Sequence, residues 1–236
     1  GNSWRQQMLK DWKSVVEKAK AQGLIAEGPA FTTNESSAAE QAAQIQNLIL
    51  EGYDAIVLDA ASPTALNAAV KKAIEAGIPV ISFDNAITEP SAYRLITDFE
   101  YYGRSEVEYL ATRLPNGGNV LEIRGLAGTY VNDAIHAGIM EGIKKYPQFK
   151  IVGEVYGNWT ESVAQKEVAG ILPSLPKIDA VVTQGGDGYG AVKAFEAAGR
   201  PIPIVFMGNR YDELEIWKEL KTKTGWDTSS CTISPS

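Results

Sequence analysis

The chain has 236 residues, of which 44% are hydrophobic and 22% charged, a composition that suits one large α/β domain or two smaller lobes and excludes a disordered, collagenous or coiled-coil chain. Its net charge of −7 argues against a nucleic-acid surface, because phosphate binding needs clustered lysines and arginines. The single histidine and single cysteine exclude a His/Cys zinc cage and an intramolecular disulfide, and no apolar run reaches the roughly 18 residues that a membrane span requires.

Short runs rich in β-branched residues alternate with amphipathic segments along the chain. The sequence predicts buried parallel strands at residues 55–58, 78–83, 119–123, 180–183 and 204–207, with a shorter strand at 93–97. Apolar residues recur at helical spacing within residues 8–19, 42–49, 66–74 and 135–146. This alternation predicts an α/β fold with parallel sheets flanked by helices.

Capping residues support these helix boundaries. Ser37 with Glu40 has the spacing of a capping box, and Ser62 before Pro63 is typical of an N-cap followed by a first-turn proline. Glycines stand where helices are expected to end, at Gly52, Gly77 and Gly199.

The pattern of residues 54–85 recurs at residues 179–209 with a nearly constant shift. Both stretches read as strand, helix, strand and polar strand end. This repetition predicts two similar lobes, the first at residues 1–98 and the second at 99–236, with a new helix opening the second.

Polar residues follow most of the predicted strands. In open parallel sheets, ligands bind beyond the carboxyl ends of the strands. The candidates at these ends are Asp84, Asn85, Asn132, Asp133, Gln184, Asp187, Asn209 and Arg210. Carboxylates, amides and guanidinium groups pair well with vicinal hydroxyls, and Trp4 and Trp159, near helix starts, offer flat rings for the apolar face of a sugar. Alternatively, residues such as Asp84 and Asp187 serve only as caps or turn residues.

Other chemistry finds little support in the sequence. The glycines after residue 184 do not have the G-x-G-x-x-G spacing of a dinucleotide-binding loop. The sequence also contains neither the P-loop motif G-x-x-x-x-G-K-[ST] nor the nucleophile elbow G-x-S-x-G. His136 lies beside the apolar face of its helix, where a structural role is expected, and Cys231 lies in a strand-like run as an inert thiol. We therefore predict no catalytic residue, no metal site and no cofactor.

Several segments resemble the type I periplasmic sugar-binding proteins, the ribose- and galactose-binding-like receptors of ABC transporters. The resemblance covers most of the chain in order. It is carried by residues 2–8, 79–85, 125–129 with Gly138, 185–191 and 207–210. It implies two lobes that close over a sugar or polyol in the cleft between them, with Asn2 and Trp4 from the first loop joining the candidates above.

The sequence also departs from the family pattern. Asn132 and Asp133 stand where an arginine is frequent, Asn85 replaces a frequent arginine, and Asn209 replaces the usual aspartate. A plain ribose or galactose assignment is therefore not carried over. Relative to the family, the first strand would precede Gly1 and the returning segment of the first lobe would follow Ser236.

The resemblance implies a monomeric, non-enzymatic solute receptor that delivers a sugar or polyol to an ABC permease in the membrane, with no nucleic acid partner. The implied location is the periplasm, or the outer face of the membrane as a lipoprotein in a Gram-positive source. Two alternatives stay open: the effector-binding core of a LacI-type transcriptional repressor, and a sugar isomerase or dehydrogenase on a doubly wound fold.

Overall fold

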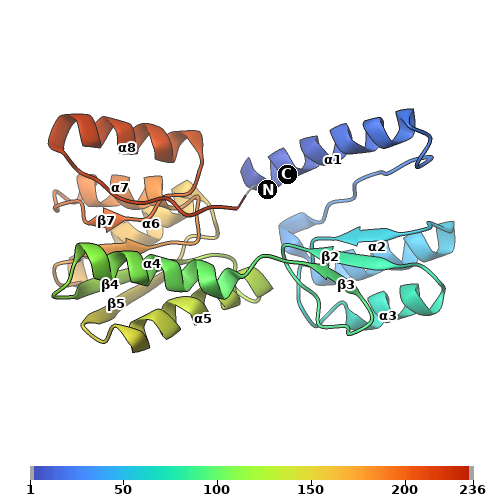
Figure 1. Ribbon diagram of the computed structural model, residues 1–236, viewed down its shortest axis with the longest axis horizontal. Helices are drawn as coiled ribbons and strands as arrows, with labels where there is room; N and C mark the ends of the chain where they lie inside the picture. The colour runs from blue at the N-terminus through green and yellow to red at the C-terminus, as the bar shows by residue number, and fades with distance from the viewer. Residues whose placement is uncertain (1–2, 234–236) are drawn as a thin grey trace. The chain divides into compact units, whose positions relative to one another are not determined.

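The computed structural model describes residues 3–233, which divide into two compact units. Of the described residues, unit one comprises 3–96 with Ile233, and unit two comprises 97–232. No helix among the described residues is long and apolar enough to cross a membrane. The predicted fold class is confirmed: both units are α/β, with parallel strands flanked by helices (Figure 1).

Unit one is built on a three-stranded parallel sheet with the strand order β1-β2-β3. Its elements are α1 (Ser3–Ala21), η1 (Asn34–Ser36), α2 (Ala38–Glu51), β1 (Ile56–Leu58), α3 (Asn67–Glu75), β2 (Val80–Phe83) and β3 (Tyr93–Leu95). Its core lies between α2, α3 and the sheet, where Ile45, Leu66 and Val70 are almost fully buried beside the strand residues.

Strand β1 is less buried than predicted, and β3, predicted only as a short strand, is exposed. In β1, Ile56 and Leu58 face the core, but Val57 points to the other face and is 44% exposed. All three residues of β3 are exposed. The apolar face expected on α1 is also only partly covered, because Val16 is buried while Val15 is exposed.

The predicted caps of unit one are only partly right. Ser37 Oγ accepts a hydrogen bond from the backbone N–H of Glu40, at 3.2 Å, but the Glu40 carboxylate accepts from Asn34 instead of closing the box. Ser62 Oγ accepts from the backbone N–H of Ala65 within a turn, and α3 begins only at Asn67, so Ser62 is not the helix cap.

Unit two is built on a four-stranded parallel sheet with the order β5-β4-β6-β7. Its elements are α4 (Phe99–Arg113), β4 (Gly118–Arg124), α5 (Tyr130–Lys145), β5 (Phe149–Tyr156), α6 (Glu161–Ile171), η2 (Leu172–Ser174), β6 (Ala180–Val182), α7 (Gly188–Ala197), β7 (Ile204–Val205) and α8 (Tyr211–Thr224). The α4 helix packs against α5, and α6 packs against α7.

Alternating residues of β4 face the two layers of helices in unit two. Leu121 and Ile123 join the core formed with α6, α7 and α8. Glu122 points to the opposite face, where it contacts His136 of α5. The two layers are distinct in Figure 1, with α4 and α5 drawn in green to yellow and α6 and α7 in orange.

Strand β5 was not among the predicted strands. Lys150, Gly153 and Glu154 interrupt its apolar pattern, and such residues are tolerated because β5 is an edge strand of the sheet.

The strand-like run around Cys231 forms only an isolated bridge between Ser230 and Met207, so the expected strand is absent there. Cys231 is partly buried, and burial, followed by the nearby Glu106 carboxylate, raises the pKa of its thiol to about 11.

Candidate functional site

Polar side chains gather after the strands in each unit. Asp84 and Asn85 follow β2, Arg124 ends β4, Gln184 closely follows β6, and Asn209 and Arg210 come after β7. The prediction for Asn2 lies outside the described residues.

In unit one, four side chains form a connected group that we call the unit-one cluster: Arg5, Asp59, Asp84 and Asn85. The Asn85 amide donates to both carboxylates, at 3.0 Å to Asp59 Oδ1 and 3.1 Å to Asp84 Oδ2. Arg5 Nε lies 3.7 Å from Asp59 Oδ2. Asn85 is 1% exposed, and the backbone of Asp84 has a left-handed φ of 53°, so the cluster is held by both packing and chain geometry.

The two carboxylates of the unit-one cluster have raised pKa values. Burial is the main cause for both, since it disfavours the charged form. For Asp84, the nearby Asp59 adds to this effect and the pKa rises to about 7. Arg5 acts in the opposite direction on both groups. The cluster therefore holds one carboxyl group poised between its neutral and charged forms near neutral pH.

Trp4 stands next to Arg5 in the first turn of α1. Its indole Nε1 donates to the backbone carbonyl of Ile233 at 3.1 Å, and its side chain is partly buried. The indole N–H is thus used within unit one, while its ring remains partly accessible.

In unit two, a second group, the unit-two cluster, comprises Arg124, Asn132, Asp133 and Gln184. Arg124 Nη2 lies 3.3 Å from Asp133 Oδ1, and Asn132 Nδ2 donates to the same oxygen at 2.8 Å. Gln184 Nε2 donates to the Asn132 backbone carbonyl at 3.0 Å. Asn132 and Gln184 are buried while Asp133 is exposed, so buried amides hold a carboxylate that solvent can reach.

Trp159 lies against the start of the loop after β4. A Cβ atom added to Gly125 would lie 2.2 Å from Cε2 of the Trp159 ring, so only glycine permits this contact. The Trp159 backbone has a left-handed φ of 53°. Its carbonyl accepts from Arg210 Nη2 at 2.8 Å, and Arg210 Nη1 donates to the Gly186 carbonyl at 2.9 Å. Arg210 therefore ties two strand-end loops together.

Asp187 is fully buried at the start of α7. Neither of its carboxylate oxygens has a hydrogen-bond partner in the described structure, and burial raises its pKa well above the usual range. Ligand access to Asp187 requires a side chain to move, whereas the exposed Asn209 is accessible as it stands.

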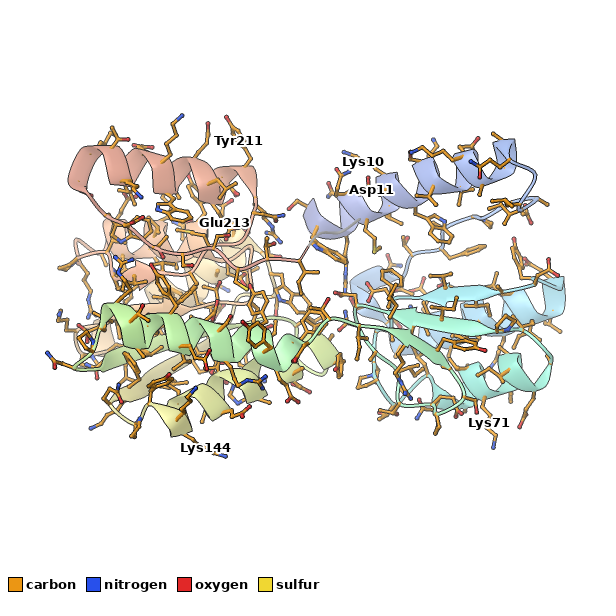
Figure 2. The ribbon with its side chains drawn as sticks, viewed as in Figure 1. Lys10, Asp11, Lys71, Lys144, Tyr211 and Glu213 are labelled. Atoms are coloured by element: carbon orange, nitrogen blue, oxygen red, sulfur yellow. The ribbon has the colours of Figure 1, made fainter. Side chains whose placement is uncertain are left out.

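Glu213 of α8 holds the loop at Gly186 and Gly188, which lies between β6 and α7. Its Oε1 accepts from the backbone N–H groups of Gly186 and Gly188, each at 3.1 Å, and it is fully buried. Figure 2 shows Glu213 on the inner side of α8, while Tyr211 of the same helix points outward. A buried carboxylate on backbone donors fixes the loop geometry.

The structure thus gathers Asp84 with Asn85 in unit one, and Asn132, Asp133 and Gln184 in unit two. Asp59, Arg124 and Glu213 were not among the predicted site residues, although Arg124 stands in the polar strand-end set read from the sequence. Asp59 and Arg124 had a readable signal, because each comes at the end of a strand. The signal for Glu213 was its place three residues after Arg210 at the start of α8.

These groups are suited to binding a polar ligand. Paired carboxylates, amides and a guanidinium offer both donors and acceptors in fixed positions, which is what a polyhydroxylated ligand requires. His136 contacts Glu122 and lies outside both clusters.

Parallel α/β units with fixed polar groups after their strands are the architecture of a two-unit ligand-binding protein. The chain belongs to the periplasmic binding protein domain family, whose model matches residues 1–229. The resemblance to periplasmic sugar-binding proteins is confirmed by this match and by the names of the relatives.

Among the relatives, a xylitol-binding protein of Mycolicibacterium smegmatis is 32% identical over 182 residues, covering 75% of this chain and 52% of its own length. A D-ribose/D-allose-binding protein of Pseudomonas aeruginosa is 30% identical over 196 residues, covering 79% of this chain and 60% of its own length. The chain therefore spans between half and two thirds of these relatives. The crystal structure of an ABC transporter solute binding protein from Thermobispora bispora matches with a TM-score of 0.90 and 36% identity, over 100% of this chain and 72% of that one.

Proposed function

We propose that this chain is the ligand-binding part of a solute receptor that captures a sugar or polyol and delivers it to an ABC importer. The observation that carries the proposal is the pair of clusters, each holding carboxylate and amide groups at strand ends or in the first turn of the helix that follows. Relatives that bind xylitol and ribose or allose support polyhydroxylated ligands as the class.

In this proposal, the ligand hydroxyls pair with Asp84 and Asn85 in unit one and with Asp133 and Asn209 in unit two. The Trp159 and Trp4 rings cover the apolar faces of the ligand, and Asn2 adds a contact from the start of the chain. Arg210, Asn132 and Gln184 hold the surrounding loops, and Asp187 contacts the ligand once the side chains that cover it move. A ligand that contacts both units favours the closed state through its higher affinity for that state.

The proposal also covers catalysis, cofactors, oligomeric state, location and the membrane partner. The receptor binds its ligand without transforming it, needs no cofactor, works as a monomer in the periplasm or at the outer face of the membrane, and meets a membrane permease. NMR of a ligand incubated with the protein is expected to show the ligand unchanged. A converted sugar would favour the enzyme alternative instead.

The proposal is tested by thermal denaturation of the protein against a panel of pentoses, hexoses and sugar alcohols. A ligand at 100 times its Kd stabilises the folded state by about 2.7 kcal/mol, which is readily measured as a rise in Tm. Calorimetric titration then gives the affinity of the best ligand.

Variants at the two clusters sharpen the test. Asp84→Ala and Asp133→Ala are each expected to weaken binding by about 1–3 kcal/mol, because a bound hydroxyl loses its partner. Asp54→Ala, at an exposed aspartate before β1, is the matched control and should leave the affinity unchanged. Unchanged affinity in both cluster variants would remove these residues from the site, and a panel without any stabilising ligand would contradict the proposed function.

Gly125→Ala tests the role of Trp159. The added methyl group displaces the indole ring, so the ligand-induced change in tryptophan fluorescence should shrink and the affinity should fall. Gly128→Ala serves as a control for the loop: its Cβ meets nothing within 4 Å, although its φ of 79° brings some backbone strain. Equal fluorescence responses in Gly125→Ala and the unaltered protein would exclude Trp159 from ligand contact.

A further inference from the structure

One histidine and two glutamates meet on the α5 face of the unit-two sheet, outside both ligand clusters. Glu122 of β4 and Glu154 of β5 are register partners in the parallel ladder, and His136 comes from α5. His136 Nδ1 lies 2.8 and 3.0 Å from the two carboxylate oxygens of Glu122. One donor atom from each of the three residues lies within 4.8 Å of the others.

The cluster combines a buried floor with an open side. The Glu122 side chain is 0% exposed, whereas the side chains of His136 and Glu154 are 29% and 39% exposed. A small ion can therefore reach the three donors from solvent and still contact a carboxylate that water does not reach.

The charges around this cluster are unbalanced. Two carboxylates that are direct neighbours on one face of a sheet repel each other. Arg124 pairs with this group: its Nη1 lies 3.5 Å from Glu154 Oε1 and its Nη2 lies 3.3 Å from the exposed Asp133. Three carboxyl groups thus stand around one guanidinium, and a bound cation would relieve the repulsion between them.

We propose that Glu122, His136 and Glu154 form a binding site for a divalent transition-metal ion, with Zn²⁺ as the best match. One imidazole nitrogen and two carboxylate oxygens suit zinc, and water completes a tetrahedral set. Calcium and magnesium prefer oxygen ligands alone. This proposal departs from the prediction of no metal site made from the sequence, where the glutamates that complete the set stand 14 and 18 residues from His136.

Binding requires only a modest rearrangement. With metal–ligand distances of about 2.0–2.2 Å and tetrahedral angles, two ligand atoms lie about 3.4 Å apart, so the metal replaces the 2.8 Å hydrogen bond between His136 and Glu122 and these two donors move slightly apart. Glu154 is the member free to turn, because its side chain is 39% exposed and its ion pair with Arg124 is long, at 3.5 Å. Arg124 keeps its contact with Asp133 when Glu154 turns toward the metal.

Calorimetric titration of the untagged, chelator-treated protein with ZnCl₂ tests the site. We expect one Zn²⁺ per chain and a rise in Tm with added zinc. Glu154→Gln and His136→Gln should each weaken zinc binding by about 10-fold or more. Losing a residue that only hydrogen-bonds to a metal ligand typically costs about 10-fold or more in affinity, and losing the ligand itself should cost at least as much. Glu196→Gln is the matched control, because Glu196 is a partly exposed glutamate in the same unit that pairs with Lys193.

Two results would overturn the proposal. One is the absence of saturable zinc binding to the unaltered protein. The other is unchanged zinc affinity in both Glu154→Gln and His136→Gln, with far-UV circular dichroism showing that the variants are folded. Because Glu154 is partly exposed at the sheet edge, its variant is expected to fold even if a change at His136 disturbs α5.

Discussion

Asp84 has a left-handed backbone conformation and a carboxyl group with a raised pKa. Its left-handed φ of 53° turns the chain immediately after β2, and the Asn85 amide holds its side chain beside Asp59. Burial and the neighbouring carboxylate raise its pKa to about 7, while an aspartate in an unfolded chain titrates near 3.9. Between these two values the folded protein keeps a proton that the unfolded chain releases.

The stability of the protein should therefore fall as the pH rises from about 4 to about 7. The raised pKa of Asp84 alone contributes a slope of at most about 1.4 kcal/mol per pH unit, because the folded state binds more protons over this range. Asp84→Asn should flatten the slope, and asparagine tolerates the left-handed backbone. Urea denaturation at about pH 5 and about pH 7.5 measures the effect.

Asp54→Asn provides the control for this experiment, because Asp54 is an exposed aspartate of the same unit. It should keep the slope of the unaltered protein. If the Asp84→Asn variant shows that same slope, the raised pKa of Asp84 is not the source of the pH dependence.

At the residue scale, the sequence predicts which side chains stand at strand ends but not what each one contacts. Asp84 and Asn85 follow β2 as expected, yet their partner Asp59 comes from a strand end 26 residues before Asn85. Arg210 was predicted as a ligand contact, which stays a prediction, and its bonds to the backbone carbonyls of two loops were not foreseen. Such partners depend on how the loops pack, which a single sequence does not encode in any local pattern.

At the scale of elements, the contact between α4 and α5 depends on two glycines. A Cβ atom on Gly138 would lie 1.9 Å from the backbone oxygen of Glu100, and one on Gly103 would lie 2.1 Å from that of Ile135. Each glycine thus lets the backbone of the opposite helix approach. A methyl group added at either glycine would clash with main-chain atoms of the opposite helix, and these cannot move aside as a flexible side chain can.

Gly138→Ala should therefore destabilise unit two by about 1–3 kcal/mol, the usual cost of overpacking. Gly170→Ala is the matched control in α6, because its Cβ would meet nothing within 4 Å. There the better helix propensity of alanine should stabilise the protein by up to about 1 kcal/mol. Urea denaturation distinguishes the two, and a neutral Gly138→Ala would contradict the close approach of α4 and α5.

Strands were predicted correctly where apolar residues form a continuous run. The strand β5 was missed, because an edge strand tolerates polar residues that break such a run. The strands β2, β4 and β6 are buried and were predicted from their β-branched runs. In β5 the residues that break the run are Lys150, Gly153 and Glu154. The run around Cys231 looked like a strand because it ends in two β-branched residues, Thr232 and Ile233, but it forms only the Ser230–Met207 bridge.

At the scale of the whole molecule, each unit has its own hydrophobic core. One core gathers residues of α2, α3, β1 and β2, and the other gathers residues of β4, β6 and β7 with α6, α7 and α8. Independent cores allow independent unfolding, because a cooperative transition extends over the residues that pack together.

Calorimetric heating of the ligand-free protein should resolve two transitions. Val70→Ala leaves a cavity in the unit-one core, so it should lower the free energy of unfolding of unit one by about 1–3 kcal/mol and shift only the transition of that unit to lower temperature. Gly138→Ala should shift only the transition of unit two. A single transition that moves as a whole in both variants would show that the units unfold together.

Cys231 makes the chain convenient for measuring distances in solution. It is the only cysteine, it is partly buried, and its pKa of about 11 leaves little thiolate at neutral pH. An exposed cysteine introduced elsewhere, with an ordinary pKa near 8.5, will react with a maleimide dye much faster. Fluorescent labels can thus be attached at chosen points on each unit while the native thiol stays in place.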